Sequence, residues 1–267
     1  MNLDNVLRKI KRDFDTAITG AIFNGRSYAN GCKAKEALIR SGKIINLIHE
    51  FVKEELKREG VPTQMIYPPL KSSRPEIKLK GFLKSKKQDI AIIPTGEIVL
   101  VAGIAVKDVE KILTINIRSQ LSSLAKNIDT LYERTFAEAL NLHLSYPNQC
   151  LGEIYLIPTH EYNDKAMIHN KMLFKSSSKI EDYIRMFQAI NNRESSNKDE
   201  YKYERVCLLI VDFRSNKPKL YSSIDELKKD RLVPATTECT LDNLTIKDFV
   251  KDILKIYKKR FGSIIVS

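Results

Sequence analysis

The sequence lacks the long apolar run, about 20 residues, that a membrane-spanning helix needs. Its first segment, Met1 to Asp15, is charged and amphipathic and contains no apolar core of the signal-peptide kind. We therefore expect a soluble, unsecreted protein located in the cytoplasm.

Motifs for zinc and for nucleotides are also missing. The four cysteines stand far apart without a CxxC pair, and the four histidines form no HxxxH or HExxH pattern, which argues against a zinc site. Cys150 and Cys207 lie in or beside apolar runs, so we interpret them as inert thiols. Neither GxxxxGKS/T nor GxGxxG occurs, so a nucleotide-handling enzyme has no support.

Positive charge is what the sequence has in excess: 45 Lys and Arg against 33 Asp and Glu, a formal net charge of +12. This excess indicates a polyanionic partner, either nucleic acid or an anionic membrane surface. The length of 267 residues is sufficient for a large buried core. We expect one α/β domain, residues 1–267, with a mixed central β-sheet flanked by helices.

Apolar spacing divides this domain into three parts. Residues 1–60 have helical periodicity, broken by a turn at 24–31, and residues 203–267 hold a strand and a final basic helix at 242–260. The middle part, residues 76–160, contains short strands expected at 76–82, 89–94, 98–102 and 113–118, followed by a strong helix. The continuous apolar runs 152–158 and 206–213 predict strands buried on both faces at the centre of the sheet.

Two stretches of the middle part carry a family resemblance. QDIAIIP (88–94) is an apolar strand that opens on one acid, and TINIRSQLSSLAKN (114–127) is a strand that ends on polar residues and runs into a helix. Together with the order of elements, they resemble the PD-(D/E)xK nuclease superfamily, in particular type II restriction endonucleases. The resemblance implies a restriction-endonuclease-like core behind N-terminal helices, a Mg²⁺ cofactor, double-stranded DNA as substrate and a homodimer.

The resemblance also implies site residues. Asp89 matches the acid that binds the metal, and the family's acid-x-lysine triplet falls on Asn116, Ile117 and Arg118. This is a double departure, because Asn116 carries no charge and Arg118 is a poor general base. Three alternatives stay open: Glu76 or Glu97 supplies the second carboxylate, an N-terminal helix supplies it through an acid such as Glu50, or the site is inactive.

Other polar residues are candidates for contacts with the phosphate backbone. Gln120 and Arg118 would contact the scissile phosphate or orient the water. Ser119, Ser122, Ser123, Lys126 and Asn127 lie near a helix N-terminus, which favours anions, although helix capping by Ser122 or Ser123 explains the serines equally well. Loop residues that could read bases are Arg26, Asn30, Asn191, Asn192 and Arg193.

A second group of candidates is the basic segment 71–87. Its seven cations are Lys71, Arg74, Lys78, Lys80, Lys84, Lys86 and Lys87, against the single acid Glu76. The segment fits phosphate binding, and it fits equally well a solvated edge strand that lysines protect from aggregation.

The sequence thus predicts a metal-dependent, sequence-specific double-stranded DNA endonuclease of the type II restriction kind. For a palindromic site, two copies related by a two-fold axis are the simplest arrangement, so a homodimer is expected. The alternative is a basic nucleic-acid-binding protein without catalysis, either a degenerate nuclease or an accessory subunit.

Overall fold

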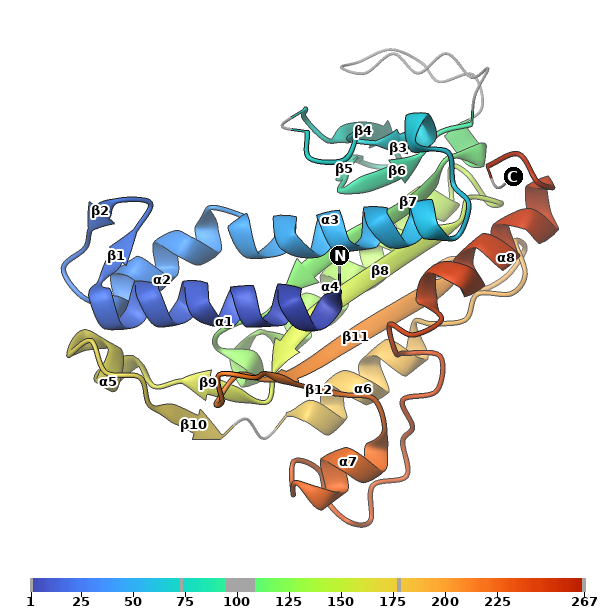
Figure 1. Cartoon of the computed structure of the whole chain (residues 1–267). Helices are drawn as coiled ribbons and strands as arrows, with labels where there is room; N and C mark the ends of the chain where they lie inside the picture. Colours follow the sequence, from blue (N-terminus) through green and yellow to red (C-terminus); the bar gives the residue numbers. More distant parts are fainter. Residues whose placement is uncertain (1, 73, 95–108, 177–178, 266–267) are drawn as a thin grey trace.

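The computed structural model describes residues 2–72, 74–94, 109–176 and 179–265, and a mixed β-sheet lies at its centre (Figure 1). Within these ranges the sheet has six strands in the order β12-β11-β8-β7-β6-β3. Their bounds are β3 Ile66–Tyr67, β6 Ile90–Ile92, β7 Leu113–Ser119, β8 Leu151–Pro158, β11 Arg205–Asp212 and β12 Lys219–Tyr221. Strands β7, β8 and β11 are parallel to one another, whereas β3, β6 and β12 pair antiparallel. The expected α/β class with a mixed sheet is confirmed.

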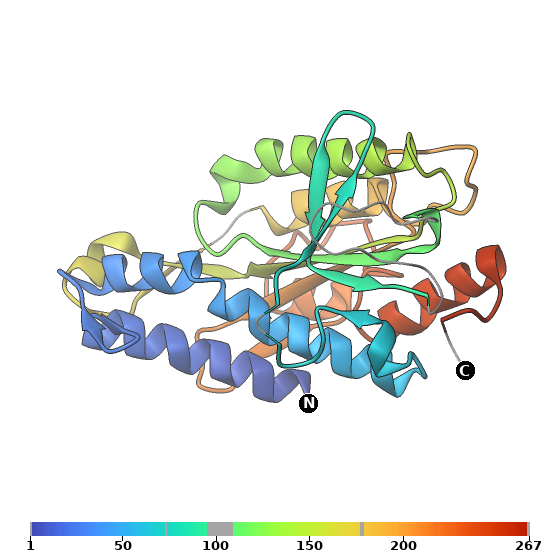
Figure 2. The same ribbon diagram turned by 90° about the horizontal axis from the view of Figure 1, so that it is seen from above.

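The expected central position of the two continuous apolar runs is also confirmed. Every residue of β8 is buried, and so is every residue of β11 except Arg205 at its start. Both strands lie inside the sheet and have helices on both sides (Figure 2). A strand covered on both faces has no solvent-facing positions, which is why these runs do not alternate.

The N-terminal part covers one face of the sheet with α1 Leu3–Gly20, α2 Gly31–Arg40 and α3 Lys43–Arg58, as its periodicity predicts. The turn between α1 and α2 is a small hairpin of β1 Ile22–Phe23 and β2 Arg26–Ser27. The C-terminal helix α8, Phe249–Phe261, starts later than expected and joins the same face. Ile10, Phe14, Ile48 and Ile253 are fully buried in this layer.

The opposite face is covered by α4 Leu124–His143 and α6 Ile180–Ala189 (Figure 2). Leu131, Ala139 and Leu142 of α4 recur at helical spacing and pack with Tyr183 and Phe187 of α6. The remaining elements are β9 His160–Tyr162, α5 Asp164–Ile168, β10 Phe174–Ser176, α7 Ile224–Lys229 and the 3₁₀ turns Thr63–Met65 and Val109–Lys111. Among the described residues, no helix combines the length and apolarity needed to cross a bilayer.

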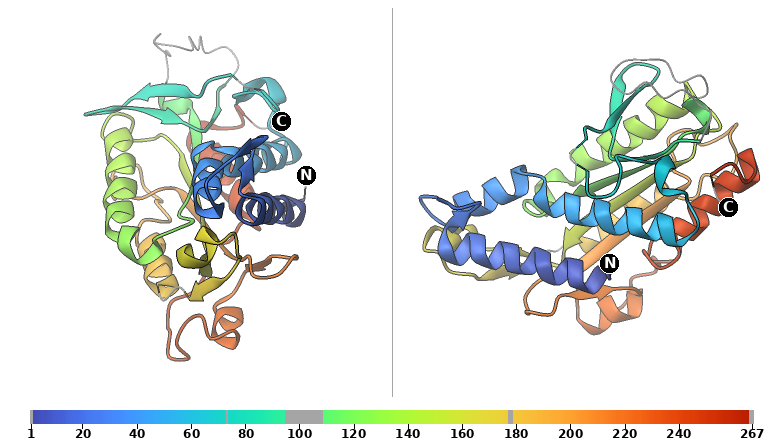
Figure 3. Two further views of the ribbon diagram at one scale, coloured as in Figure 1. Left: turned by 90° about the vertical axis from the view of Figure 1, so that its left-hand side faces the viewer. Right: turned by 45° about the horizontal axis from the view of Figure 1, so that its top comes forward.

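A lysine-rich hairpin departs from the prediction of a single strand at 76–82. Strands β4 Ile77–Lys80 and β5 Ser85–Gln88 pair antiparallel and reach over α4 (Figure 3). Residues 66–67 form the edge strand β3. The expected strand 98–102 and the candidate Glu97 lie outside the described residues.

The chain changes phase by one residue between β5 and β6. In β5, the even-numbered side chains of Lys86 and Gln88 turn toward α4, where they reach Glu138 and Asn116. In β6, the even-numbered Ile90 and Ile92 pack instead with the layer of α1 and α3. Strict alternation would keep all even positions on one face. The shift falls on Asp89, the bend between the two strands, and an irregularity of this kind re-aims the side chain that it contains.

Candidate functional site around Asp89

Asp89 and Asn116, which the resemblance singled out separately, are neighbours in the structure. Strand β6 pairs antiparallel with β7, with Ile90 opposite Ile115. The backbone N–H of Asp89 donates to Asn116 Oδ1 at 3.1 Å, and Asp89 Oδ2 accepts from the backbone N–H of Ile117 at 2.6 Å. The carboxylate of Asp89 is therefore fixed on β7.

A pocket of about 460 Å³ lies beside Asp89, and we call it the Asp89 pocket. Its lining comes from α3, from the connection after β3 and from the segment leading into β4, and includes charged residues of both signs. The acids of the lining are Glu50, Glu76 and Asp89, the cations are Lys53, Lys71 and Arg74, and His49 is also part of it. Two of the three carboxylates that the sequence left as alternatives, Glu76 and Glu50, thus lie at one pocket with Asp89.

Hydrogen bonds and ion pairs organise this pocket. Glu50 accepts from Lys53 Nζ at 2.7 Å and from the backbone N–H of Lys71 at 2.8 Å. His49 Nε2 lies 3.6 Å from Asp89 Oδ2, is buried, and has no hydrogen-bond partner among the described residues. Asp89 keeps 22% of its side chain exposed, so it is open to a ligand in the pocket.

Arg118 lies on the other face of the sheet, in what we call the Arg118 cluster (Asn116, Arg118, Glu138 and Glu153). Its guanidinium pairs with Glu138 of α4, and its Nε lies 3.1 Å from Glu153 Oε1 of β8. Asn116 Nδ2 donates to Glu138 Oε1 at 3.1 Å and to Gln88 Oε1 at 3.2 Å. Asn116 pairs with Glu153 in the β7–β8 register, which places the two side chains on the same face.

Glu153 is short of hydrogen-bond donors. It is fully buried, and neither carboxylate oxygen accepts a hydrogen bond from a residue that the structure describes, although Arg118 is close. Burial raises the pKa of Glu153 to about 8; Arg118 opposes this, while the charges of Glu138 and Asp89 add to it. The charge of Glu153, in turn, raises the pKa of Arg118 above its ordinary value. The guanidinium is therefore committed to two carboxylates.

The start of α4 already has an anion. The carboxylate of Glu161, on β9, accepts from the backbone N–H groups of Ser123 at 2.8 Å and Leu124 at 3.0 Å. Ser123 precedes the helix with φ of +54° and makes no side-chain capping bond. Capping by Ser123, one of the two capping alternatives for the serines, is therefore not what the structure has, because Glu161 supplies the cap. The same carboxylate occupies the position in which a phosphate would sit.

The other predicted phosphate contacts are spread out. The amide of Gln120 donates to the carbonyl of Ser122, and Ser119 ends β7 half-buried. Lys126 is exposed and Asn127 half-buried in the first turn of α4. Of the hairpin lysines, Lys84 and Lys87 are exposed, whereas Lys86 lies 3.3 Å from Glu138 and joins the Arg118 cluster.

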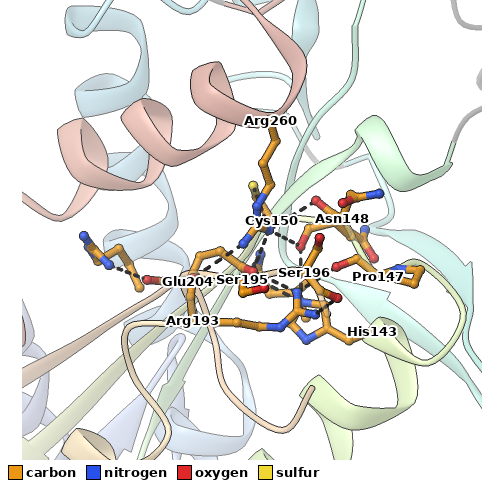
Figure 4. A network of polar contacts seen from close by, with 12 residues as sticks. His143, Pro147, Asn148, Cys150, Arg193, Ser195, Ser196, Glu204 and Arg260 are labelled. Carbon is orange, nitrogen blue, oxygen red and sulfur yellow. Dashed lines mark hydrogen bonds and ion pairs between the residues drawn. The ribbon is translucent and has the colours of Figure 1, made fainter. Parts of the chain in front are cut away.

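Two of the loop candidates for base readout are buried. Asn191 donates to the carbonyl of Asn243, and Arg193 is fully buried with Glu204, Arg260 and His143 in what we call the Glu204 clasp (Figure 4). A base cannot reach either side chain, so these two expectations are wrong. Cys150 lies against Arg260 there, and burial raises the pKa of its thiol, as it does for Cys207. Both thiols are buried and protonated at neutral pH, as an inert thiol requires.

The sequence reasoning missed His49 and Lys53 at the pocket and Glu138 and Glu153 in the Arg118 cluster. Glu153 carries the signal by which Asp89 was found, because it is a single acid in an otherwise apolar strand. Glu138 continues the buried stripe of α4, seven residues after Leu131. No local signal indicates His49 or Lys53, whose spacing simply follows the buried face of α3.

The donor chemistry of the Asp89 pocket fits a magnesium ion. The described residues contain no group of three or more His, Cys, Asp or Glu arranged to hold a metal. Magnesium, however, is usually bound by one or two carboxylates together with water and substrate oxygens. Asp89, with Glu76 or Glu50 at the same pocket, meets that smaller requirement.

Known proteins give no further guidance. Comparisons of the chain with protein-family models, with curated proteins and with solved structures find no match.

Proposed function

We propose that this protein is a metal-dependent endonuclease that cleaves double-stranded DNA at specific sites, in the manner of a type II restriction enzyme. One observation carries the proposal: Asp89 is fixed on β7 in the lining of a pocket that contains two further carboxylates and three cations. Acids to hold a hard cation and basic groups to hold phosphate are the two requirements of metal-assisted phosphodiester hydrolysis.

The topology supports the proposal. After α3 and the edge hairpin of β4 and β5, the chain forms β6 directly after Asp89, then β7, helix α4 and strand β8, which is parallel to β7. This is the order that the resemblance to PD-(D/E)xK nucleases implies. The acid of the resemblance, Asp89 at the bend before β6, donates its backbone N–H to Asn116 of β7, the position of the family's second acid.

Asp89 and Glu76 would hold Mg²⁺, with Glu50 as the alternative to Glu76. A bound magnesium ion polarises the scissile phosphate and lowers the pKa of a water molecule on it. Lys71 and Arg74 line the same pocket and would bind the phosphate oxygens. His49 lies on the α3 side of Asp89 and would position the carboxylate.

The departure at Arg118 has a structural explanation within this proposal. The side chain is held by Glu138 and Glu153 on the α4 face and so would support the sheet beneath Asp89. The cation that the family places at the phosphate would come instead from Lys53, Lys71 or Arg74 on the α3 face.

A specific observation favours the second candidate, a nucleic-acid-binding protein without catalysis. Asn116 is neutral where the family has an acid, and its side chain is engaged with Gln88 and Glu138. If this departure has removed catalysis, the basic hairpin would still bind a polyanion.

The test is cleavage of unmethylated phage DNA with Mg²⁺ by the wild type, by Asp89→Asn and by Glu76→Gln. In Asp89→Asn the side-chain amide oxygen would still accept from the Ile117 N–H, so we expect a folded variant whose cleavage rate falls by about 10²–10³-fold or more. Glu133→Gln, on the exposed face of α4, serves as the matched control and should cleave normally.

Discrete fragments from the wild type and none from Asp89→Asn would support the nuclease. DNA binding without cleavage under Mg²⁺, Mn²⁺ or Ca²⁺ would support the binding protein instead. Light scattering with a palindromic duplex tests the proposed homodimer, because two copies should bind one site.

A further inference from the structure

The turn of the lysine-rich hairpin presents two large apolar side chains to solvent. Phe82 is 62% exposed and Leu83 is 80% exposed, the two highest values for large hydrophobic residues among those described. They stand next to each other between β4 and β5, on the part of the hairpin that reaches over α4 (Figure 3). Two adjacent apolar side chains held out in water indicate a contact surface.

A buried asparagine holds this turn rigid. Asn141 of α4 accepts through Oδ1 from the backbone N–H groups of Leu83 at 2.8 Å and Lys84 at 2.9 Å. Its Nδ2 donates to the carbonyl of Lys84 at 2.9 Å, and its own carbonyl accepts from the N–H of Phe82 at 2.8 Å. We call these four bonds the Asn141 clamp.

Gly81 permits this close approach. A Cβ atom at position 81 would lie 2.0 Å from Asn141 Nδ2 and 2.7 Å from its carbonyl oxygen, which no side chain allows. The backbone of the turn is thus pinned to α4 while the side chains of Phe82 and Leu83 are exposed to solvent. An ordered apolar tip of this kind loses little conformational entropy when it inserts into a partner.

The charge around the tip selects the partner. Lys78, Lys80, Lys84 and Lys87 are exposed along the two strands, and Glu76 at the base is the only acid of segment 71–87. Protection of an edge strand explains such lysines, but it does not explain a pinned apolar tip between them. Strand β5 continues directly into Asp89, so the lysines form a basic track from the tip to the Asp89 pocket.

We propose that Phe82 and Leu83 form a wedge that inserts between stacked base pairs of a DNA duplex, while the hairpin lysines hold its phosphates. Apolar wedges of this kind unstack a base step and kink the duplex. Leu83 and Asp89 are six residues apart, which is at most about 20 Å of strand, or about six base pairs along the helix. The kink would therefore lie close to the bond that is cut. The choice of DNA as partner rests on the function proposed above.

The experiment is DNA binding without any divalent metal, using duplexes in which 2-aminopurine replaces one base in turn. The emission of this base analogue rises when it is unstacked. We expect a rise at one or two positions with the wild type. The double variant Phe82→Ser/Leu83→Ser should lose the rise while its Kd increases less than about tenfold, because phosphate contacts dominate affinity.

Three further variants sharpen the test. Ile168→Ser/Leu173→Ser removes two comparably exposed apolar side chains near β9 and β10, at the far end of the molecule from the hairpin, and should leave the rise unchanged (Figure 1). Asn141→Ala keeps Phe82 and Leu83 but releases the turn, and it should weaken the rise. Lys80→Gln/Lys84→Gln should weaken binding and lower the slope of log K against log salt by about 1–2.

Two results would overturn the wedge: binding without a rise at any position, or a rise that survives in the Phe82→Ser/Leu83→Ser variant. Binding to anionic phosphatidylserine vesicles, lost in that variant, with no binding to DNA would also overturn it. The nuclease is judged separately. Base unstacking without cleavage under any metal would support the wedge and contradict the nuclease. Cleavage without unstacking would support the nuclease and contradict the wedge.

Discussion

Glu153 and Glu204 are both fully buried beside arginines, yet they differ in their supply of hydrogen-bond donors. Glu204 accepts from the backbone N–H of Leu151 and from the guanidinium groups of Arg193 and Arg260, and His143 lies 3.5 Å away. Glu153 accepts no hydrogen bond, and Arg118 is its one ion-pair partner among the described residues.

The two pKa values move in opposite directions as a result. Burial by itself would raise the pKa of Glu204, but His143, Arg260 and the Leu151 N–H together lower it. For Glu153 burial prevails over Arg118, and the pKa rises to about 8. A buried carboxylate with a full set of donors fixes elements together, whereas one with an incomplete set marks a region where charge is poorly balanced.

The largest effect should come from Glu204→Ala. The change leaves Arg193 fully buried without a countercharge, so we expect the free energy of unfolding to fall by about 3–5 kcal/mol. Denaturation by urea at neutral pH measures it. Glu133→Ala on the exposed side of α4 is the control and should change stability by less than about 0.5 kcal/mol. Similar losses from both variants would mean that the Glu204 clasp contributes nothing special.

Glu153→Gln should act in the opposite direction. The pKa of Glu153 in the folded protein is about 8, above the ordinary value of 4.5. Folding therefore favours the protonated carboxyl group. The stability of the protein is highest below pH 4.5 with respect to this group, and it falls as the pH rises to about 8. The full shift corresponds to about 5 kcal/mol, and relaxation around Arg118 reduces it. We expect a gain of about 1–3 kcal/mol near pH 9 and little change near pH 5.

Urea denaturation of the wild type and Glu153→Gln across this pH range checks the sign. A variant that is less stable than the wild type near pH 9 would contradict the comparison, because Glu153 would then behave like Glu204.

Asn116→Asp gives the smallest expected effect and restores the acid of the family triplet. It removes the Nδ2 donor that Gln88 and Glu138 share and adds a negative charge next to Glu153. We expect a loss of about 1–2 kcal/mol near pH 8 that shrinks at lower pH, as repulsion between like charges requires. A pH-independent loss would show that the lost hydrogen bonds alone are responsible.

Local patterns predicted most of the fold. The helices of residues 1–60 and the buried strands β8 and β11 follow from apolar periodicity over a few residues, whereas Asp89 and Asn116 were singled out by the family resemblance. Strand β5 was missed because its sequence, SKKQ, has no apolar alternation and forms a strand through pairing with β4. Its partner strand and the support from α4 decide its conformation, and a short sequence window contains neither.

Pairings between distant residues account for the errors in the site. Glu161, which caps α4, lies 38 positions after Ser123 in the chain. Glu204 forms ion pairs with Arg193 and Arg260, which come from different parts of the chain. The sequence shows the charged residues directly and predicts roughly on which strands and helices they lie. It does not predict which charges form ion pairs with one another, because those pairs depend on how the layers pack.

The one-residue phase shift at Asp89 has a consequence for insertions and deletions. Deleting Asp89 would make Gln88 and Ile90 adjacent, and strict alternation would then keep them on the opposite faces that they already occupy. The lysine face of the hairpin and the buried face of β6 would both be retained. Such a deletion removes the bend itself, and with it the carboxylate that accepts from Ile117 and lines the pocket, so a homologue shorter by this one residue would keep the sheet and lose the candidate site.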